Sequence, residues 1–245
     1  MATNDRLQGL HQGIKLHLGC GLTHLDGWVN CDRTKHSPHV DEAFDLMADW
    51  PFPDNSVSAV YASHVLEHLP DPFHFFAELW RVLLPVGTAL LRVPFGGHRS
   101  AWGDLTHLRA YYPESFAFVQ PGYAAAVGNP QSDAWTAFFG LGSVDVRMDP
   151  AVIPWAKWRL LYRLLVPLLP YLPALSQEIF VDLFPLKTAD AQAHYAATHV
   201  ANAVPVQYIV YQHQWDRRTP APGEPLTMRP LAVTHRTVLE QGYRS

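Results

Sequence analysis

A β-α-β pattern in residues 57–93 constrains the fold of this chain more than any other feature. Residues 57–63 form a short apolar run typical of a strand, and residues 88–93 form a second, continuous one. Asp71 suits the N-cap of a helix between them, and Pro72 suits its first position. The apolar residues at helical spacing are Phe73, Phe76, Ala77, Trp80 and Leu84, and Pro85 and Gly87 are expected to end the helix. The pattern predicts parallel strands joined by a right-handed crossover.

Short apolar runs bounded by turn residues continue on both sides of this unit. They predict strands at Ile14–Leu18, Trp28–Asp32, Ala43–Met47, Ser143–Met148 and Val206–His213, with a short helix from Pro113. We therefore expect an α/β fold: a Rossmann-like, mostly parallel, doubly wound sheet of about seven strands with helices on both faces.

The first connection of this predicted sheet is unusually short. Only residues 22–27 separate Gly21 from Trp28, whereas a parallel crossover normally needs a dozen residues or more. Two readings follow: either the first crossover helix is vestigial, or the second strand is wrongly placed.

The second half of the chain is rich in proline. We expect a single domain over residues 1–215, with a mostly helical insertion or cap at 154–200 near the C-terminal strands, followed by an extended arm at 216–245. Apolar residues recur at helical spacing in the insertion: Trp155, Trp158, Leu161, Leu165 and Leu168. This face is expected to pack on the sheet or to form a homodimer contact, and docking to a membrane surface or closing over an apolar substrate stays open.

Charge and cysteine content restrict the partners and the compartment. The net charge is −4 and only four of the 18 basic residues are lysines, so no basic stripe suited to nucleic acid is expected. Two cysteines, Cys20 and Cys31, cannot form a disulfide framework, and the N-terminus shows no secretory signal, which favours the cytoplasm. The most apolar stretch, 164–175, is short and contains three prolines, so no transmembrane segment is expected.

Polar residues follow three of the predicted strands. Gly19 and Gly21 after the first strand allow a tight turn that approaches a ligand, and Asp32 at the end of the second suits the two hydroxyls of a ribose. Asp49 and Trp50 combine a carboxylate and an aromatic ring, as an adenine site needs. Ligands bind outside the carboxyl ends of parallel strands, so we expect these groups to share one crevice.

Six segments together resemble the class I S-adenosylmethionine-dependent methyltransferases, specifically the small type 11-like group. They are LHLGCG (16–21), GWVNCD (27–32), ADWPFPDNSV (48–57), YASHVLEHLPDP (61–72), ELWRVLLPVGTALLRVP (78–94) and GDLTHLRAYYPESF (103–116). They occur in the family's order and cover about the first half of the chain.

The resemblance implies S-adenosylmethionine as cofactor. The cofactor-binding residues that it implies are Gly19, Cys20, Gly21, Asp32, Asp49, Trp50 and His64. It places His64 near the sulfonium and the acceptor, and Asp104, Thr106, His107 and Arg109 in an acidic-His-Arg loop on the acceptor side. We expect His107, or else His64, to act as the base, Asp104 to orient His107, and Thr106 and Arg109 to bind the substrate.

The expected reaction is in-line methyl transfer to a hydroxyl or similar acceptor on a small molecule, glycan or natural product. Residues 62–65 lack the tetrapeptide of base-modifying methyltransferases, which again argues against nucleic acid. One alternative is a zinc-dependent hydrolase, because His64-Val65-Leu66-Glu67-His68 also fits an H-x-x-E-H zinc motif. The following Pro70 and Pro72 end any helix there, so no metal is expected. A second alternative is a pseudoenzyme that binds the cofactor without turnover.

Overall fold

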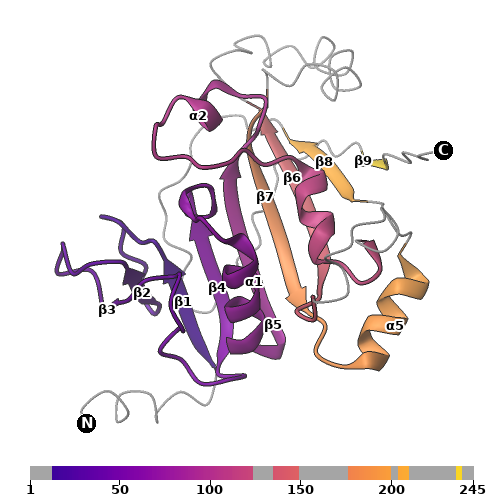
Figure 1. The fold of residues 1–245 in the computed structure, drawn as a ribbon, viewed down its shortest axis with the longest axis horizontal. Coiled ribbons are helices and arrows are strands. Elements are labelled where there is room, and N and C mark those ends of the chain that lie inside the picture. Colours follow the sequence, from indigo (N-terminus) through magenta and orange to yellow (C-terminus); the bar gives the residue numbers. More distant parts are fainter. Residues whose placement is uncertain (1–12, 124–134, 149–175, 200–203, 210–235, 239–245) are drawn as a thin grey trace.

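The computed structural model describes residues 13–123, 135–148, 176–199, 204–209 and 236–238. These residues form a nine-stranded sheet with the order β3-β2-β1-β4-β5-β7-β6-β8-β9 (Figure 1). The strands are β1 Ile14–Leu18, β2 Val29–Asp32, β3 Glu42–Ala43, β4 Val57–Ser63, β5 Leu83–Pro94, β6 Phe139–Met148, β7 Ser176–Pro185, β8 Pro205–Ile209 and β9 Arg236–Val238. The helices are α1 Pro72–Val82, α2 Arg99–Trp102, α5 Ala189–Thr198 and the 3-10 helices η1 Leu66–His68 and η2 Pro113–Val119.

The N-terminal half of the sheet is parallel. β2 pairs with β1 and β3, and β4 pairs with β1 and β5, all in the parallel sense. The order 3-2-1-4-5 is that of the doubly wound nucleotide-binding fold, in which a crevice opens where the strand order reverses, here between β1 and β4. The predicted Rossmann-like, mostly parallel sheet is confirmed.

The connection from β1 to β2 contains no helix. The two strands nevertheless pair in parallel, with Leu16 opposite Val29 and Leu18 opposite Cys31. Buried Asn30 holds the connection: its Oδ1 accepts from the Leu25 amide at 2.9 Å, and its Nδ2 donates to the Leu25 and Trp28 carbonyls, both at 3.2 Å. The first of the two readings is therefore correct: the crossover helix is missing and the second strand is in place.

Helix α1 begins as predicted but ends earlier. The Asp71 carboxylate accepts hydrogen bonds from the amides of Phe73 and His74, and Pro72 is the first helical residue. The helix stops at Val82, and β5 starts at once, so Pro85 and Gly87 lie within a strand. The predicted buried face is also partly wrong, because Phe73 is 45% exposed. The buried residues of α1 are Phe75, Phe76, Glu78, Leu79 and Val82.

The prediction of a mostly helical insertion over 154–200 is wrong for residues 176–185. These residues form β7, which lies between β5 and β6 and is antiparallel to both. Ile179, Val181 and Leu183 are fully buried in β7. They alternate along the chain, so they share one face of the strand, which is the period of a strand rather than of a helix. Helix α5 agrees with the prediction, and residues 154–175, including Trp155 and Trp158, lie outside the described residues.

The core lies between the sheet and the segments that cover it. Figure 1 shows α1 in front of β4 and β5, and its Phe76 ring contacts the Phe139 ring of β6. No helix among the described residues is long and apolar enough to cross a bilayer. Most of the predicted 216–245 arm lies outside the described residues; its one described element, β9, pairs antiparallel with β8. The single-domain boundary at residue 215 stays a prediction.

Candidate functional site

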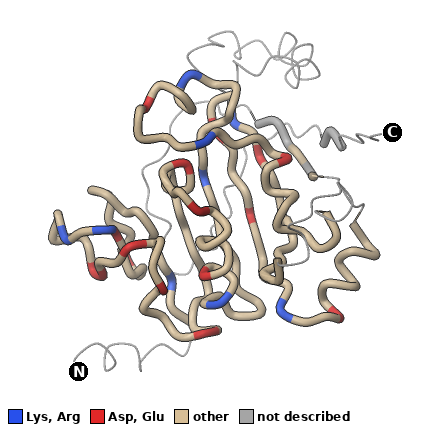
Figure 2. Tube along the Cα trace, in the orientation of Figure 1, with Lys and Arg blue, Asp and Glu red and all other residues tan. Residues whose placement is uncertain are grey.

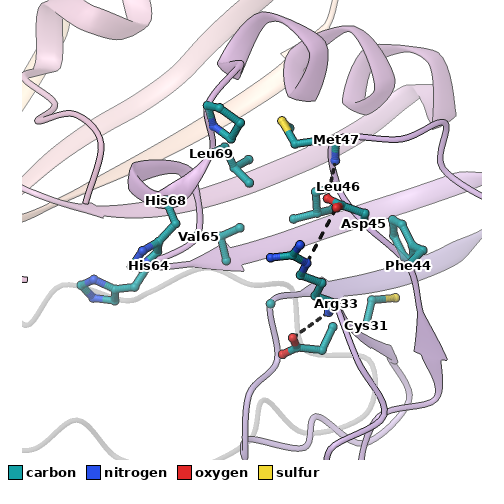
Figure 3. A pocket seen from close by; sticks show the side chains of 13 residues that line it. Cys31, Arg33, Phe44, Asp45, Leu46, Met47, His64, Val65, His68 and Leu69 are labelled. Atoms are coloured by element: carbon teal, nitrogen blue, oxygen red, sulfur yellow. Dashed lines mark hydrogen bonds and ion pairs between the residues drawn. The ribbon is translucent and has the colours of Figure 1, made fainter. Parts of the chain in front are cut away.

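A cavity of about 360 Å³ lies at the carboxyl ends of β1, β2, β3 and β4 (Figure 3). Its wall comes from Gly19, residues 31–33, residues 44–47, and residues 64–65 and 68–70. This is the sheet edge at which the sequence predicts the crevice, and the strand order places it at the switch point. The cavity volume is within the range of small-molecule sites.

Gly19 and Gly21 shape the turn after β1. Both have left-handed backbones, with φ of +63° and +55°. At Gly19 a Cβ atom would lie 2.3 Å from Cγ2 of Val65, so only glycine fits between β1 and the segment after β4. The Gly21 amide donates to Oδ2 of Asp32 at 2.7 Å, which ties the end of β1 to the end of β2.

Of the four residues predicted at the ends of β1 and β2, two line the cavity. Gly19 and Asp32 do, whereas Cys20 and Gly21 stand behind them. Cys20 is buried, and burial, with the nearby Asp32 carboxylate, raises the pKa of its thiol. The carboxylate of Asp32 also accepts from the Arg33 amide at 2.7 Å, which fixes its orientation at the cavity wall.

Asp49 and Trp50 do not line the cavity. Trp50 is only 3% exposed: its ring packs against Phe44 and Phe75 in the core, and its Nε1 donates to the Leu46 carbonyl. Its buried ring therefore cannot cover an adenine in this cavity, and Asp49 is exposed to solvent away from the wall.

The wall after β3 consists of Phe44, Asp45, Leu46 and Met47 instead (Figure 3). These wall residues are not evident from the sequence, because its pattern predicts a third strand that runs to Met47, whereas β3 ends at Ala43. The carboxyl edge therefore starts at Phe44. Asp45 lies 3.7 Å from Nε of Arg33 and accepts from the Met47 amide, so this segment is anchored to the end of β2.

His64 lines the cavity in an uncommon backbone conformation, with φ of +55°. Its Nδ1 lies 3.1 Å from Glu67 and its Nε2 lies 3.2 Å from Glu178. Burial lowers the pKa of His64, but the two carboxylates outweigh burial and raise it to about 9. His64 is therefore a cation at neutral pH, donates to both carboxylates, and has no free lone pair with which to act as a base.

Glu178 of β7 is the residue that holds His64 from the opposite side. Burial raises the pKa of its carboxyl group, but hydrogen bonds from His64 and Arg92 and the charge of Arg147 outweigh burial and lower the pKa to about 2. The sequence analysis did not find Glu178, since it placed this segment in a helical insertion. An acidic residue within an apolar strand-like run was the available signal.

The predicted acidic-His-Arg loop adjoins the cavity but does not line it. The Leu108 amide donates to the Glu67 carbonyl at 2.8 Å, and Arg109 donates to the Pro70 carbonyl at 2.7 Å. Thr106 Oγ1 hydrogen-bonds Asp104 and lies 3.0 Å from Nδ1 of His68, which does line the cavity. Arg109 thus binds backbone in this structure, and the roles of Thr106 and Arg109 toward a substrate stay predictions.

His107 is almost buried, with 7% of its side chain exposed. Its Nδ1 donates to the Ala101 carbonyl at 3.0 Å, which leaves the lone pair on Nε2. Nε2 lies 4.0 Å from Oε1 of Glu67 and 4.0 Å from Oδ2 of Asp104. The side chain therefore faces Glu67 in the segment after β4, and its role on an acceptor side stays a prediction.

The HVLEH pentapeptide does not form the helix that a zinc protease motif needs. His64 follows β4 directly, and Leu66–His68 is a single 3-10 turn. Both ring nitrogens of His64 are taken by carboxylates. His64 and His68 are therefore not joint metal ligands in this structure, and the zinc-hydrolase reading has no support.

Comparison with known proteins finds similarity over part of the chain. Residues 31–91 match a family model described as a methyltransferase domain. A protein of Mycobacterium avium (strain 104), named uncharacterized methyltransferase, is 44% identical over 129 residues, which cover 44% of this chain and 47% of that protein. A probable S-adenosylmethionine-dependent methyltransferase of Mycolicibacterium smegmatis is 42% identical over 74 residues, 30% of this chain and 28% of that protein.

Solved structures with a similar fold include a SAM-dependent methyltransferase from Archaeoglobus fulgidus, with a TM-score of 0.44 and 14% identity, covering 73% of this chain and 89% of that one. A methyltransferase from Mesorhizobium loti has a TM-score of 0.40 and 14% identity, covering 73% of this chain and 95% of that one.

The match over residues 31–91 supports the resemblance to the class I S-adenosylmethionine-dependent methyltransferases, and with it S-adenosylmethionine as the cofactor. The chain matches less than half the length of the two curated relatives described above. The residues at the cavity fit the cofactor: the Asp32 carboxylate suits ribose hydroxyls, and Phe44, Leu46 and Met47 offer an apolar surface to a base.

Proposed function

We propose that this protein transfers a methyl group from S-adenosylmethionine, in line, to a hydroxyl or similar acceptor on a small molecule, glycan or natural product. One observation carries the proposal: the cavity lies at the switch point of the parallel strands and is lined by both Gly19 and Asp32.

The cofactor half of the site uses Asp32 and the segment after β3. A carboxylate can accept about four hydrogen bonds. Asp32 accepts one from the Gly21 amide and one from the Arg33 amide. The remaining acceptor capacity serves the ribose hydroxyls. Phe44, Leu46 and Met47 replace Trp50 as the apolar surface for the adenine.

The acceptor half uses His64, His68 and the loop that contains His107. The bound cofactor supplies an electrophilic methyl group on a sulfonium. Because the leaving group departs neutral, the protein mainly has to align the acceptor and exclude water. His107 activates the acceptor through its Nε2 lone pair, with Asp104 beside it, while cationic His64 fixes the segment after β4.

The distribution of basic residues bears on the proposed acceptor class. In Figure 2 the Lys and Arg residues of the described part are dispersed over strands and loops rather than gathered along one groove. The expectation of no nucleic-acid partner stays a prediction, as do peripheral membrane contact, a homodimer and a cytoplasmic location.

The test is calorimetry with S-adenosylmethionine, followed by mass spectrometry of metabolites incubated with protein and cofactor. We expect binding, and metabolites that gain one CH₂ unit in mass. His107→Ala is expected to slow turnover with little loss of cofactor affinity. Absence of cofactor binding would refute the activity, and transfer only to nucleic acid or protein would refute the acceptor class. Binding without turnover on any acceptor would favour the pseudoenzyme.

A further inference from the structure

Glu67, His68 and His107 form a cluster beside the cavity that the methyl-transfer site does not explain. Glu67 and His68 lie on η1, and His107 lies on the loop after α2. Their ligand atoms, one from each residue, all lie within 4.8 Å of one another. We propose that this cluster binds one divalent transition-metal ion of the zinc type.

The burial of Glu67 is the first reason. The residue is 1% exposed, and among the described residues its Oε2 atom has no hydrogen-bond partner. A buried carboxylate oxygen without a partner costs free energy unless a cation lies against it. His64 contacts only the other oxygen, Oε1, at 3.1 Å. His64 therefore serves one oxygen of this carboxylate, and Oε2 is left with no donor or cation against it among the described residues.

The orientation of the two imidazoles is the second reason. His107 Nδ1 donates to the Ala101 carbonyl at 3.0 Å, and His68 Nδ1 lies 3.3 Å from the carbonyl and 3.0 Å from the hydroxyl of Thr106. A backbone carbonyl on one ring nitrogen fixes the other as the ligand, which is the usual arrangement of metal-binding histidines. The two rings meet edge to face with centroids 4.7 Å apart.

The distances are those of a site that closes slightly on binding. His107 Nε2 lies 4.0 Å from Glu67 Oε1, too far for a hydrogen bond. Zinc bonds of about 2.1 Å to nitrogen and oxygen place tetrahedral ligand atoms roughly 3.4 Å apart. These two atoms would therefore have to approach by about half an ångström on metal binding, and a pair at the 4.8 Å limit of the cluster by about 1.4 Å.

Backbone hydrogen bonds hold the two segments together without the ion. The Leu108 amide donates to the Glu67 carbonyl at 2.8 Å, and the Tyr111 hydroxyl donates to the Leu66 carbonyl at 3.2 Å. Arg109 adds a bond to the Pro70 carbonyl. The ligands are thus preorganised by main-chain contacts, which distinguishes the cluster from an accidental group of surface side chains.

The donor set indicates the class of metal and its use. Two imidazoles and one carboxylate favour zinc or a related first-row ion over magnesium or calcium. Three protein ligands leave a position open, which is typical of catalytic rather than structural zinc sites. Asp104 lies beside that position: its Oδ2 is 4.0 Å from His107 Nε2, while its Oδ1 accepts hydrogen bonds from Thr106. His68 lines the cavity, so the ion would lie at its edge.

The use of the ion rests on the proposed function, whereas its binding does not. A metal at the cavity edge would bind an acceptor hydroxyl and lower its pKa. The Nε2 lone pair of His107 would then bind the ion in place of acting directly as the base. This set differs from the H-x-x-E-H motif, because His64 is excluded and His107 comes from a distant loop.

The experiment is calorimetric titration of the full-length chain, stripped of metal with a chelator, with Zn²⁺ alone. We expect one tight equivalent, weakened at least about tenfold in His68→Gln and in His107→Gln. The matched control is His74→Gln on α1, whose ring hydrogen-bonds the Ala48 carbonyl outside the cluster and whose loss should leave zinc affinity unchanged. The two variants lie on different segments, so either one decides the test if the other does not fold.

The outcomes separate the two proposals. Absence of a tight zinc equivalent, or equal affinity in parent and both cluster variants, overturns the metal site. Zinc binding lost in the variants, together with no binding of S-adenosylmethionine to the parent, supports the metal site and refutes the methyltransferase proposal. Cofactor binding without zinc binding does the reverse.

Discussion

The two aspartates that the sequence nominates for the cofactor differ in their surroundings. Asp32 lines the cavity and accepts from the Gly21 amide, whereas Asp49 is exposed and lies outside the wall. We expect Asp32→Ala to weaken S-adenosylmethionine binding by about 1–3 kcal/mol, because it removes the acceptor of the ribose and of the glycine turn. Asp49→Ala is the matched control and should leave the affinity unchanged. If calorimetry finds the same S-adenosylmethionine affinity for the two variants, Asp32 does not bind the cofactor.

A second prediction at this scale concerns Asp145 of β6. Burial, with the charge of Asp182, raises the pKa of its carboxyl group to about 6, above the unfolded value of 3.8. Among the described residues its Oδ1 has no hydrogen-bond partner. Between these two pH values the unfolded chain has released the proton while the folded chain retains it, so stability falls as pH rises through this window.

The Asp145→Asn substitution replaces the carboxyl group by an amide, which does not ionise, so this pH dependence is lost. We expect the variant to match the parent near pH 4 and to be more stable above pH 6 by up to about 3 kcal/mol, the free energy of a shift of about two pKa units. Urea unfolding at several pH values measures the difference. Equal slopes of stability against pH in parent and variant would show that Asp145 ionises normally.

At the scale of elements, the connection from β1 to β2 depends on two glycines for different reasons. Gly19 needs both a left-handed backbone and the space of the missing Cβ beside Val65, whereas at Gly21 nothing lies within 4 Å of an added Cβ. Gly21→Ala should therefore cost only the backbone strain, about 1–2 kcal/mol. Gly19→Ala should cost more, because Val65 is buried and stiff at χ1. Chemical denaturation that ranks the two variants the other way would contradict this close packing.

The elements also show how far sequence reasoning reaches. β1, β4 and the start of α1 follow from apolar runs and the Asp71-Pro72 cap, which are local signals. β7 was missed because its position between β5 and β6 depends on pairing with strands far away in the chain. The same applies to the site. Asp32 could be predicted from the sequence because it ends an apolar run. Finding Phe44 to Met47 needs the exact end of the two-residue strand β3, and finding Glu178 needs the pairing partners of β7.

At the scale of the whole molecule, the two halves of the sheet contribute differently to the cavity. The parallel half provides the cavity wall after β1, β2, β3 and β4. The antiparallel half contributes Glu178, which contacts His64 of the cavity wall, and Arg147, which contacts Glu178. A ligand in the cavity should therefore stabilise the parallel half against local opening more than the antiparallel half.

Hydrogen exchange with and without S-adenosylmethionine tests this division. A ligand at 100 times its Kd stabilises the bound state by about 2.7 kcal/mol, enough to slow local opening where it binds. We expect new protection in residues 19–33, 44–47 and 64–70, and little change in β6 and β7 away from Glu178. Asp32→Ala at the same cofactor concentration should show less protection in the same peptides. Protection confined to β6 and β7 would place the ligand on the antiparallel half and refute the cavity as the cofactor site.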